Sequence, residues 1–77
     1  MAKRVVVYSQ PGLLFCGKVK EFLSQNNIPF TERNIAADPA ALDELEKLGY
    51  MTTPVTVVDA QVVVGFDRAK LEALLGR

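Results

Sequence analysis

The sequence contains one cysteine and no histidine among its 77 residues. A lone cysteine excludes an intramolecular disulfide, and without histidine it leaves too few ligands for a closed zinc site. The absence of histidine also removes the commonest general base, so a Ser-His-Asp or Cys-His catalytic arrangement is excluded. Any chemistry of this chain must therefore use its single thiol, its carboxylates or its surface.

Long apolar runs and an excess of charge of either sign are also absent. Nine basic and nine acidic residues cancel, so the chain lacks an electrostatic footprint for nucleic acid or an acidic membrane. Apolar runs such as Val5–Tyr8 are far shorter than the roughly 20 residues of a membrane-spanning helix. We therefore expect no nucleic-acid partner, no membrane segment and a cytoplasmic location, which also suits a free thiol.

The composition is sufficient for one small packed domain. Hydrophobic residues make up 49% and charged residues 23% of the chain, a balance that favours a core over disorder. No linker, repeat or low-complexity tract divides the sequence. We predict a single domain over residues 1–77, of a size that buries roughly 60% of its unfolded surface.

Three segments have helical signals. Phe15, Val19 and Leu23 recur at helical spacing on one face of the first segment. Asp38 followed by Pro39 is a typical N-cap and first helical position, and Asp67 can cap the last segment. These signals predict helices over residues 14–26, 38–49 and 67–75, caps included. The acidic residues around the second helix are interpreted as a solvated face: Asp38, Asp43, Glu44 and Glu46.

Four Val-rich or alternating segments predict strands at residues 3–8, 29–35, 54–58 and 61–65. The two-residue connection Asp59-Ala60 requires the last two strands to form an antiparallel hairpin. Its conformation is left open, because alanine is poorly suited to a positive φ. The helical crossover makes the first two strands parallel. The fold class is therefore α/β, a mixed four-stranded sheet with three helices in the order β-α-β-α-β-β-α.

That order, together with four motifs, resembles the glutaredoxin family of the thioredoxin-fold superfamily, and in particular small bacterial members that include reductants of ribonucleotide reductase. The resemblance covers nearly the whole chain and implies a thioredoxin-like fold, sheet order 2-1-3-4 and thiol–disulfide exchange. It also implies a cis peptide bond between Thr53 and Pro54. The segments that carry it are Val5–Tyr8 with Ser9-Gln10-Pro11, Cys16–Leu23, Thr53-Pro54-Val55 and Gly65-Phe66-Asp67.

The chain departs from the family at the active-site motif Cys-x-x-Cys, whose first cysteine lies two residues after the proline. Leu13 occupies that place here, and Cys16 matches the second cysteine. Leucine has no nucleophilic sulfur, so we expect this member of an oxidoreductase family to have lost dithiol activity or to be strongly impaired. Reading Cys16 instead as the cysteine of a monothiol Cys-Gly-Phe-Ser motif is disfavoured, because Lys18-Val19 does not match Phe-Ser.

Cys16 lies about one turn into the predicted first helix, in line with Val19 and Leu23. Apolar neighbours would shield its thiol, so we interpret it as a small buried hydrophobe. Two alternatives stay open. One is monothiol exchange or glutathionylation at Cys16, and the other is a non-catalytic module that holds an extended thiol peptide beside the cis-proline.

The resemblance also implies a groove for substrate or glutathione. Its candidate residues are Tyr8, Gln10, Pro11, Gly12, Phe15, Thr53, Pro54, Gly65, Phe66 and Asp67, with Met51 and Thr52 beside them. The Thr53 backbone would pair with a peptide or glutathione, and the corner at Gly65 would hold a carboxylate or amine of glutathione. Tyr8 suits the core equally well, and capping alone would account for Asp67.

Two residues of this groove weaken the case for glutathione. Gln10 stands where the family often has a basic residue, and Phe66 is more similar to the partners of ribonucleotide reductase. We expect no metal and no bound cofactor. The expected partners are glutathione, as a co-substrate, or a disulfide-bearing protein such as a ribonucleotide reductase, and we expect a monomer.

Overall fold

Seven elements build the described part of the chain, in the predicted order β-α-β-α-β-β-α. The computed structural model describes residues 3–76, so residues 1, 2 and 77 of the predicted domain lie outside it. Every element lies within two residues of its predicted bounds. The elements are β1 (Val5–Ser9), α1 (Leu14–Gln25), β2 (Thr31–Asn34), α2 (Pro39–Lys47), β3 (Val55–Val58), β4 (Gln61–Val64) and α3 (Arg68–Leu75). None of the helices within residues 3–76 has the length and apolar character needed to cross a bilayer.

The four strands form one mixed sheet with the order β2-β1-β3-β4. β1 pairs in parallel with β2 and antiparallel with β3, and β3 pairs antiparallel with β4. The mixed sheet and the order 2-1-3-4 implied by the resemblance are thus confirmed. β1 is central and buried along almost its whole length, which explains its continuous run of apolar residues.

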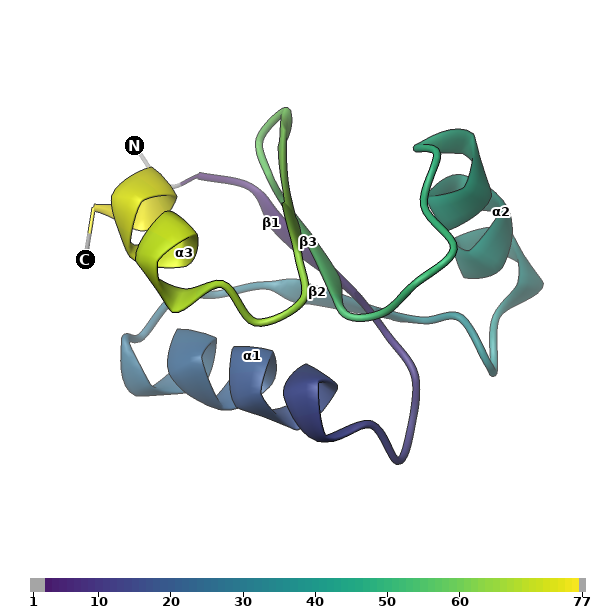
Figure 1. Ribbon diagram of the computed structural model, residues 1–77, viewed down its shortest axis with the longest axis horizontal. Coiled ribbons are helices and arrows are strands. Elements are labelled where there is room, and N and C mark those ends of the chain that lie inside the picture. The colour runs from purple at the N-terminus through teal and green to yellow at the C-terminus, as the bar shows by residue number, and fades with distance from the viewer. Residues whose placement is uncertain (1–2, 77) are drawn as a thin grey trace.

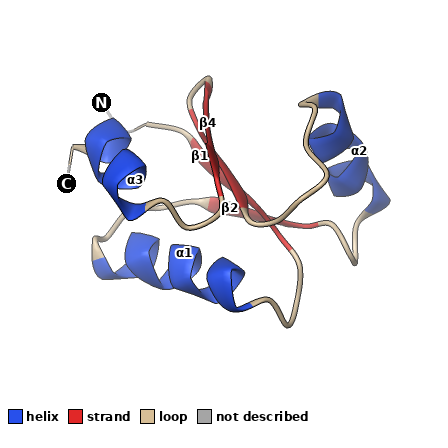
Figure 2. Cartoon of the chain, in the orientation of Figure 1, coloured by secondary structure: helices blue, strands red, loops and turns tan. Residues whose placement is uncertain are grey.

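Helices cover both faces of this sheet. Figures 1 and 2 show α1 and α3 on one side of the strands and α2 on the other. The core beneath α1 and α3 contains Val5, Val7, Val19, Phe22, Leu23, Val63 and Leu71. The smaller core beneath α2 contains Tyr8, Leu45 and Val55. Val7 and Tyr8 are adjacent on β1 yet belong to different cores, because successive side chains of a strand point to opposite faces.

The turn between β3 and β4 is fixed by the start of β1. Asp59 adopts a positive φ of 55°, which aspartate tolerates better than most residues. The Arg4 N–H donates to Asp59 Oδ1 at 2.9 Å, and the Asp59 N–H donates to the Arg4 carbonyl at 2.8 Å. The positive φ therefore falls on aspartate, and the alanine that made the turn hard to predict does not need one.

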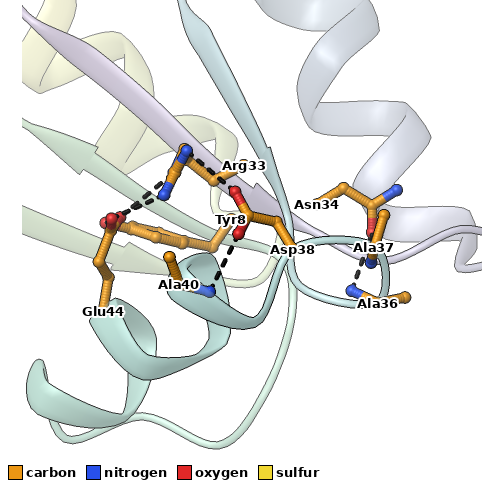
Figure 3. Close-up of polar contacts among 8 residues, drawn as sticks. All are labelled: Tyr8, Arg33, Asn34, Ala36, Ala37, Asp38, Ala40 and Glu44. Carbon is orange, nitrogen blue, oxygen red and sulfur yellow. Dashed lines mark hydrogen bonds and ion pairs between the residues drawn. The ribbon is translucent and has the colours of Figure 1, made fainter.

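A network of polar side chains ties α2 to the sheet (Figure 3). Arg33 of β2 donates through Nε and Nη2 to the Glu44 carboxylate at 3.2 and 2.7 Å, and the Tyr8 hydroxyl donates to it at 3.1 Å. Asp38 caps α2 by accepting the Ala40 N–H at 3.0 Å and lies 3.3 Å from Arg33 Nη1. The interpretation of Asp38 and Glu44 as a merely solvated face is therefore corrected, because both bind a strand residue.

Candidate functional site

Three loops meet at the end of the sheet where β1 and β4 finish and β3 begins. Tyr8 pairs with Val55, and Val55 pairs with Val64. The segments that follow β1, precede β3 and follow β4 therefore leave the sheet at the same end. The Gly65 N–H donates to the Pro54 carbonyl at 2.8 Å, which fixes the last two segments directly against each other. The structure thus brings the predicted site segments to one end of the molecule.

The loop after β1 delivers Leu13 to the start of α1. Gly12 adopts a φ of 83°, a left-handed conformation that favours glycine. Leu13 is the N-cap of α1, with φ −96° and ψ 126°, and its side chain makes no capping hydrogen bond. Leucine is among the poorest N-cap residues, because it offers no acceptor to the free N–H groups of the first turn. The chain therefore places an inert side chain where an anion would be most favoured.

Cys16 lies about one turn further along α1 than Leu13 and is buried in the protein interior. Its exposed fraction is 2%, and it is a free thiol. Val19 and Leu23, the neighbours at i+3 and i+7 on α1, are fully buried. The interpretation of Cys16 as a small buried residue is confirmed, and its sulfur is shielded from a disulfide in solution.

Large apolar side chains are exposed around this end of the sheet. Leu13, Leu14 and Phe15 are 44%, 71% and 55% exposed, and we call these three residues the 13–15 patch. Met51, close to Thr53 in the cis-proline loop, is 79% exposed. Consecutive exposed apolar residues of this size are unusual on a monomer and mark interaction sites.

The segments that form the site also lack charge. Residues 9–17, 48–58 and 60–66 contain no Lys, Arg, Asp or Glu, and Asp67 is the first charged residue that follows β4. A ligand confined to these segments would meet backbone groups, hydroxyls, the Gln10 amide and apolar side chains. Lys18 and Arg68 line a pocket together with Phe66, so charged side chains lie next to that part of the site.

The other predicted site residues differ in how far they are exposed. Gln10, Pro11 and Gly12 are exposed, Thr53 and Gly65 are half-buried, and Pro54 is buried. The Thr53–Pro54 peptide bond is cis, as the resemblance implies.

Tyr8, Phe66 and Asp67 have structural partners. The Tyr8 side chain lies in the α2 core. This burial is the main cause that raises the pKa of Tyr8 above its ordinary value, and the hydrogen bond from its hydroxyl to Glu44 raises it further. Phe66 packs edge-to-face on Phe22 with ring centroids 6.3 Å apart. Asp67 caps α3 by accepting the Lys70 N–H at 3.1 Å. These contacts are sufficient to explain why each side chain is where it is.

Sequence reasoning missed a second polar cluster, at the end of β1. The buried Ser9 hydroxyl donates to Glu32 Oε2 at 2.8 Å, and Lys20 Nζ donates to the same oxygen at 2.8 Å. The hydrogen bond from Lys20, with a smaller effect of the one from Ser9, lowers the pKa of Glu32 below its ordinary value. The cluster joins β1, α1 and β2, and no local pattern could reveal it because the residues are far apart in the sequence.

Glu32 should make stability depend on pH. Because the pKa of Glu32 is lower in the folded chain, its stabilising effect is present above the unfolded pKa and is lost as pH falls through the folded pKa. Glu32→Gln should reduce the free energy of unfolding by on the order of 0.5 kcal/mol at about pH 7, since the carboxylate is partly solvated, and by less at about pH 3. Urea unfolding of both proteins at the two pH values measures this, and a constant difference would contradict it.

No group of three or more His, Cys, Asp or Glu side chains within residues 3–76 is arranged to hold a metal ion.

Comparison with known proteins agrees with this geometry. The family model described as glutaredoxin matches residues 5–63. A glutaredoxin-like 8.6 kDa protein of the rubredoxin operon in Clostridium pasteurianum is 33% identical over 72 residues, which are 92% of this chain and 96% of that protein. The crystal structure of the thioredoxin-like protein BC3987 superposes with a TM-score of 0.88 at 40% identity, covering 94% of this chain and all of that one.

A partial match is to the global transcriptional regulator Spx 1 of Oceanobacillus iheyensis. It is 44% identical over 48 residues, which are 62% of this chain but only 37% of the regulator.

Proposed function

Since this chain belongs to the glutaredoxin family, we propose that it is a redox-family protein in which dithiol exchange has been lost at Leu13. The observation that carries the proposal is the position of Leu13 at the N-cap of α1, partly exposed and without a capping hydrogen bond. This is where a thiolate would be stabilised by the helix terminus and reached by a substrate.

The chemistry of disulfide exchange explains the loss. A thiolate attacks one sulfur of the substrate disulfide, forms a mixed disulfide and releases the other sulfur as a thiolate. Leu13 has no sulfur with which to begin this step. Cys16 has one, but at 2% exposure it is not accessible to a disulfide in solution. The same burial argues against monothiol exchange at Cys16.

Reduction of the mixed disulfide between glutathione and 2-mercaptoethanol tests the proposal. The native chain should react at the rate of the buffer control, whereas Leu13→Cys should react much faster. Activity in the native chain equal to that of Leu13→Cys would contradict it.

The second candidate function is binding without turnover, and the 13–15 patch favours it. The patch lies at the sheet end where Thr53 precedes β3, and Thr53 makes no hydrogen bond to another residue within 3–76. An extended peptide could pair with the Thr53 backbone and place apolar side chains on the patch. Glutathione, the proposed co-substrate of a thiol-bearing form, fits less well beside Thr53, because residues 9–17 and 48–58 offer its two carboxylates no basic side chain.

Titration separates these ligands. The uncharged peptide acetyl-Gly-Val-Leu-Val-Gly-amide should shift the amide resonances of Leu14, Phe15 and Thr53, and reduced glutathione at the same concentration should shift them less. Phe15→Ser is the matched control, since Phe15 is 55% exposed and its loss should leave the fold intact while weakening the peptide shifts. Equal shifts with glutathione, or peptide shifts unchanged in Phe15→Ser, would contradict the binding mode.

A further inference from the structure

A pocket lies between α1 and the start of α3, outside the groove beside the cis-proline. The loop from β4 to α3 passes α1 there (Figure 1), and Phe66 of this loop packs edge-to-face on Phe22 of α1. The pocket has a volume of about 210 Å³. We call it the α1–α3 pocket, and its lining includes Lys18, Glu21, Phe22, Gln25, Phe66 and Arg68.

Two cationic side chains of this pocket keep hydrogen-bond donors available. Lys18 is exposed and forms no ion pair with another residue between positions 3 and 76. Arg68 pairs with Glu72 through its Nε atom, at 3.5 Å, and neither of its Nη atoms takes part in that pair. The Arg68 guanidinium also lies over the Phe22 ring, with Cζ 5.9 Å from the centroid. This cation–π contact positions the guanidinium without using its N–H groups.

The acidic side chain of the lining already has a partner. Glu21 accepts a hydrogen bond from Gln25 Nε2 at 3.3 Å. Lys18 and Arg68 against Glu21 leave the lining with one net positive charge. The pocket therefore combines an aromatic wall with two cations that can still donate, and an anionic group on a short apolar stem complements both features.

The pocket is continuous with the surface to which the proposed peptide would bind. Leu14 of the 13–15 patch and Lys18 are four residues apart on α1, so they lie on the same face of the helix. On the other side, the Gly65 N–H donates to the Pro54 carbonyl at 2.8 Å, and Phe66 is the next residue. A segment that lies on the patch and beside the cis-proline therefore reaches the pocket with a neighbouring residue.

We propose that the α1–α3 pocket binds an aspartate or glutamate side chain of a partner protein, next to apolar residues of the same partner segment that lie on the 13–15 patch. The inference rests on the proposed binding function and names the chemistry of its partner. The carboxylate would accept hydrogen bonds from the Arg68 Nη atoms and from Lys18 Nζ. The methylene groups that carry it would pack on Phe66.

A protein segment suits this surface better than a small anion does. The 13–15 patch exposes three large apolar side chains beside the pocket, and burying them requires apolar groups on the ligand. Glutathione offers carboxylates but no apolar side chain, so it would engage the two cations and leave the patch in water. A partner segment that is apolar and acidic in turn would use both.

Two peptides of equal length test the proposal by calorimetric titration. They are acetyl-Glu-Glu-Val-Leu-Val-Glu-Glu-amide and its counterpart with glutamine at all four acidic positions, so that either chain direction can bring the variable residues to the pocket. The acidic peptide should bind the native chain about fivefold more tightly, because two partly exposed ion pairs form. In amide spectra it should also shift Phe66 and Arg68 more than the glutamine peptide does.

A variant with both pocket cations removed, Lys18→Gln with Arg68→Gln, should bind the two peptides equally. Lys47→Gln with Lys70→Gln is the matched control, because it removes the same charge from exposed positions that do not line the pocket. This control should keep most of the preference for the acidic peptide. If the pocket variant folds poorly, the two peptides on the native chain, with the shifts at Phe66 and Arg68, decide the question.

Three results would overturn the proposal. They are equal affinity of the native chain for both peptides, an equal loss of preference in the pocket variant and its control, and shifts from glutathione at Phe66 and Arg68 as large as those from the acidic peptide. Binding of both peptides without a preference would leave the proposed binding function intact. Acid-dependent shifts at Phe66 without any shift at Thr53 would support the pocket and contradict that function's binding mode.

Discussion

Replacing Leu13 with cysteine should give this chain the activity of a disulfide reductant. The rate of reduction of a glutathione mixed disulfide should rise above the native chain's background by about 100-fold or more. No other single substitution is expected to change activity by as much, because it supplies the one atom that the reaction needs.

The local geometry is already suited to a thiolate. Leu13 is the N-cap of α1 and is 44% exposed, so a sulfur there would be reachable. The unpaired N–H groups of the first turn would donate hydrogen bonds to the thiolate and lower the pKa of the introduced thiol. That thiolate would attack the glutathione sulfur and release 2-mercaptoethanol. A glutathione thiolate would then free the protein and form oxidised glutathione.

Two control variants isolate the cause. Leu13→Ser has nearly the size of cysteine and improves the N-cap, but it has no thiol and should stay at background. Leu14→Cys adds a more exposed thiol one residue further on, outside the Cys-x-x-Cys spacing, and should be much less active than Leu13→Cys. If Leu14→Cys matched Leu13→Cys, the position of Leu13 would have no special role.

Truncating Leu23 should have the largest effect on stability. Leu23 on α1 is fully buried in the core with Val7 and Val63 of the sheet. Leu23→Ala removes buried methyl groups and leaves a cavity, which costs about 2–5 kcal/mol. A domain of this size has a total stability on the order of 4–12 kcal/mol, so much of the protein should be unfolded on moderate heating.

Leu14→Ala is the matched control on the same helix. Leu14 is 71% exposed, so the same chemical change should shift the free energy of unfolding by about 0.5 kcal/mol or less. Urea unfolding followed by circular dichroism measures both. A comparable loss in the two variants would show that α1 does not bury the face described above.

The local signals in the sequence were sufficient for the elements and their order. Asp38 followed by Pro39 starts α2 because capping and the fixed φ of proline act within a few residues. The two-residue connection Asp59-Ala60 predicted the β3–β4 hairpin, because so short a connection can join only antiparallel strands.

What the sequence did not reveal depends on register between distant segments. Arg33 reaches Glu44 and Tyr8 only once β2 has paired with β1 and α2 has docked. The Ser9–Glu32–Lys20 cluster likewise needs three elements in place. In the candidate site, the sequence was sufficient to identify Leu13 at the nucleophile position. The exposure of the 13–15 patch became clear only from the fold.

The burial of Cys16 gives the protein a built-in probe of its own motions. Because it is the only cysteine in the chain and is shielded by the native structure, a thiol reagent can modify it only when the start of α1 opens. Labelling kinetics on the unmodified protein therefore report the frequency of that opening without competing sites or an introduced dye. A buried thiol can serve in this way to measure how the end of the molecule that holds the site fluctuates.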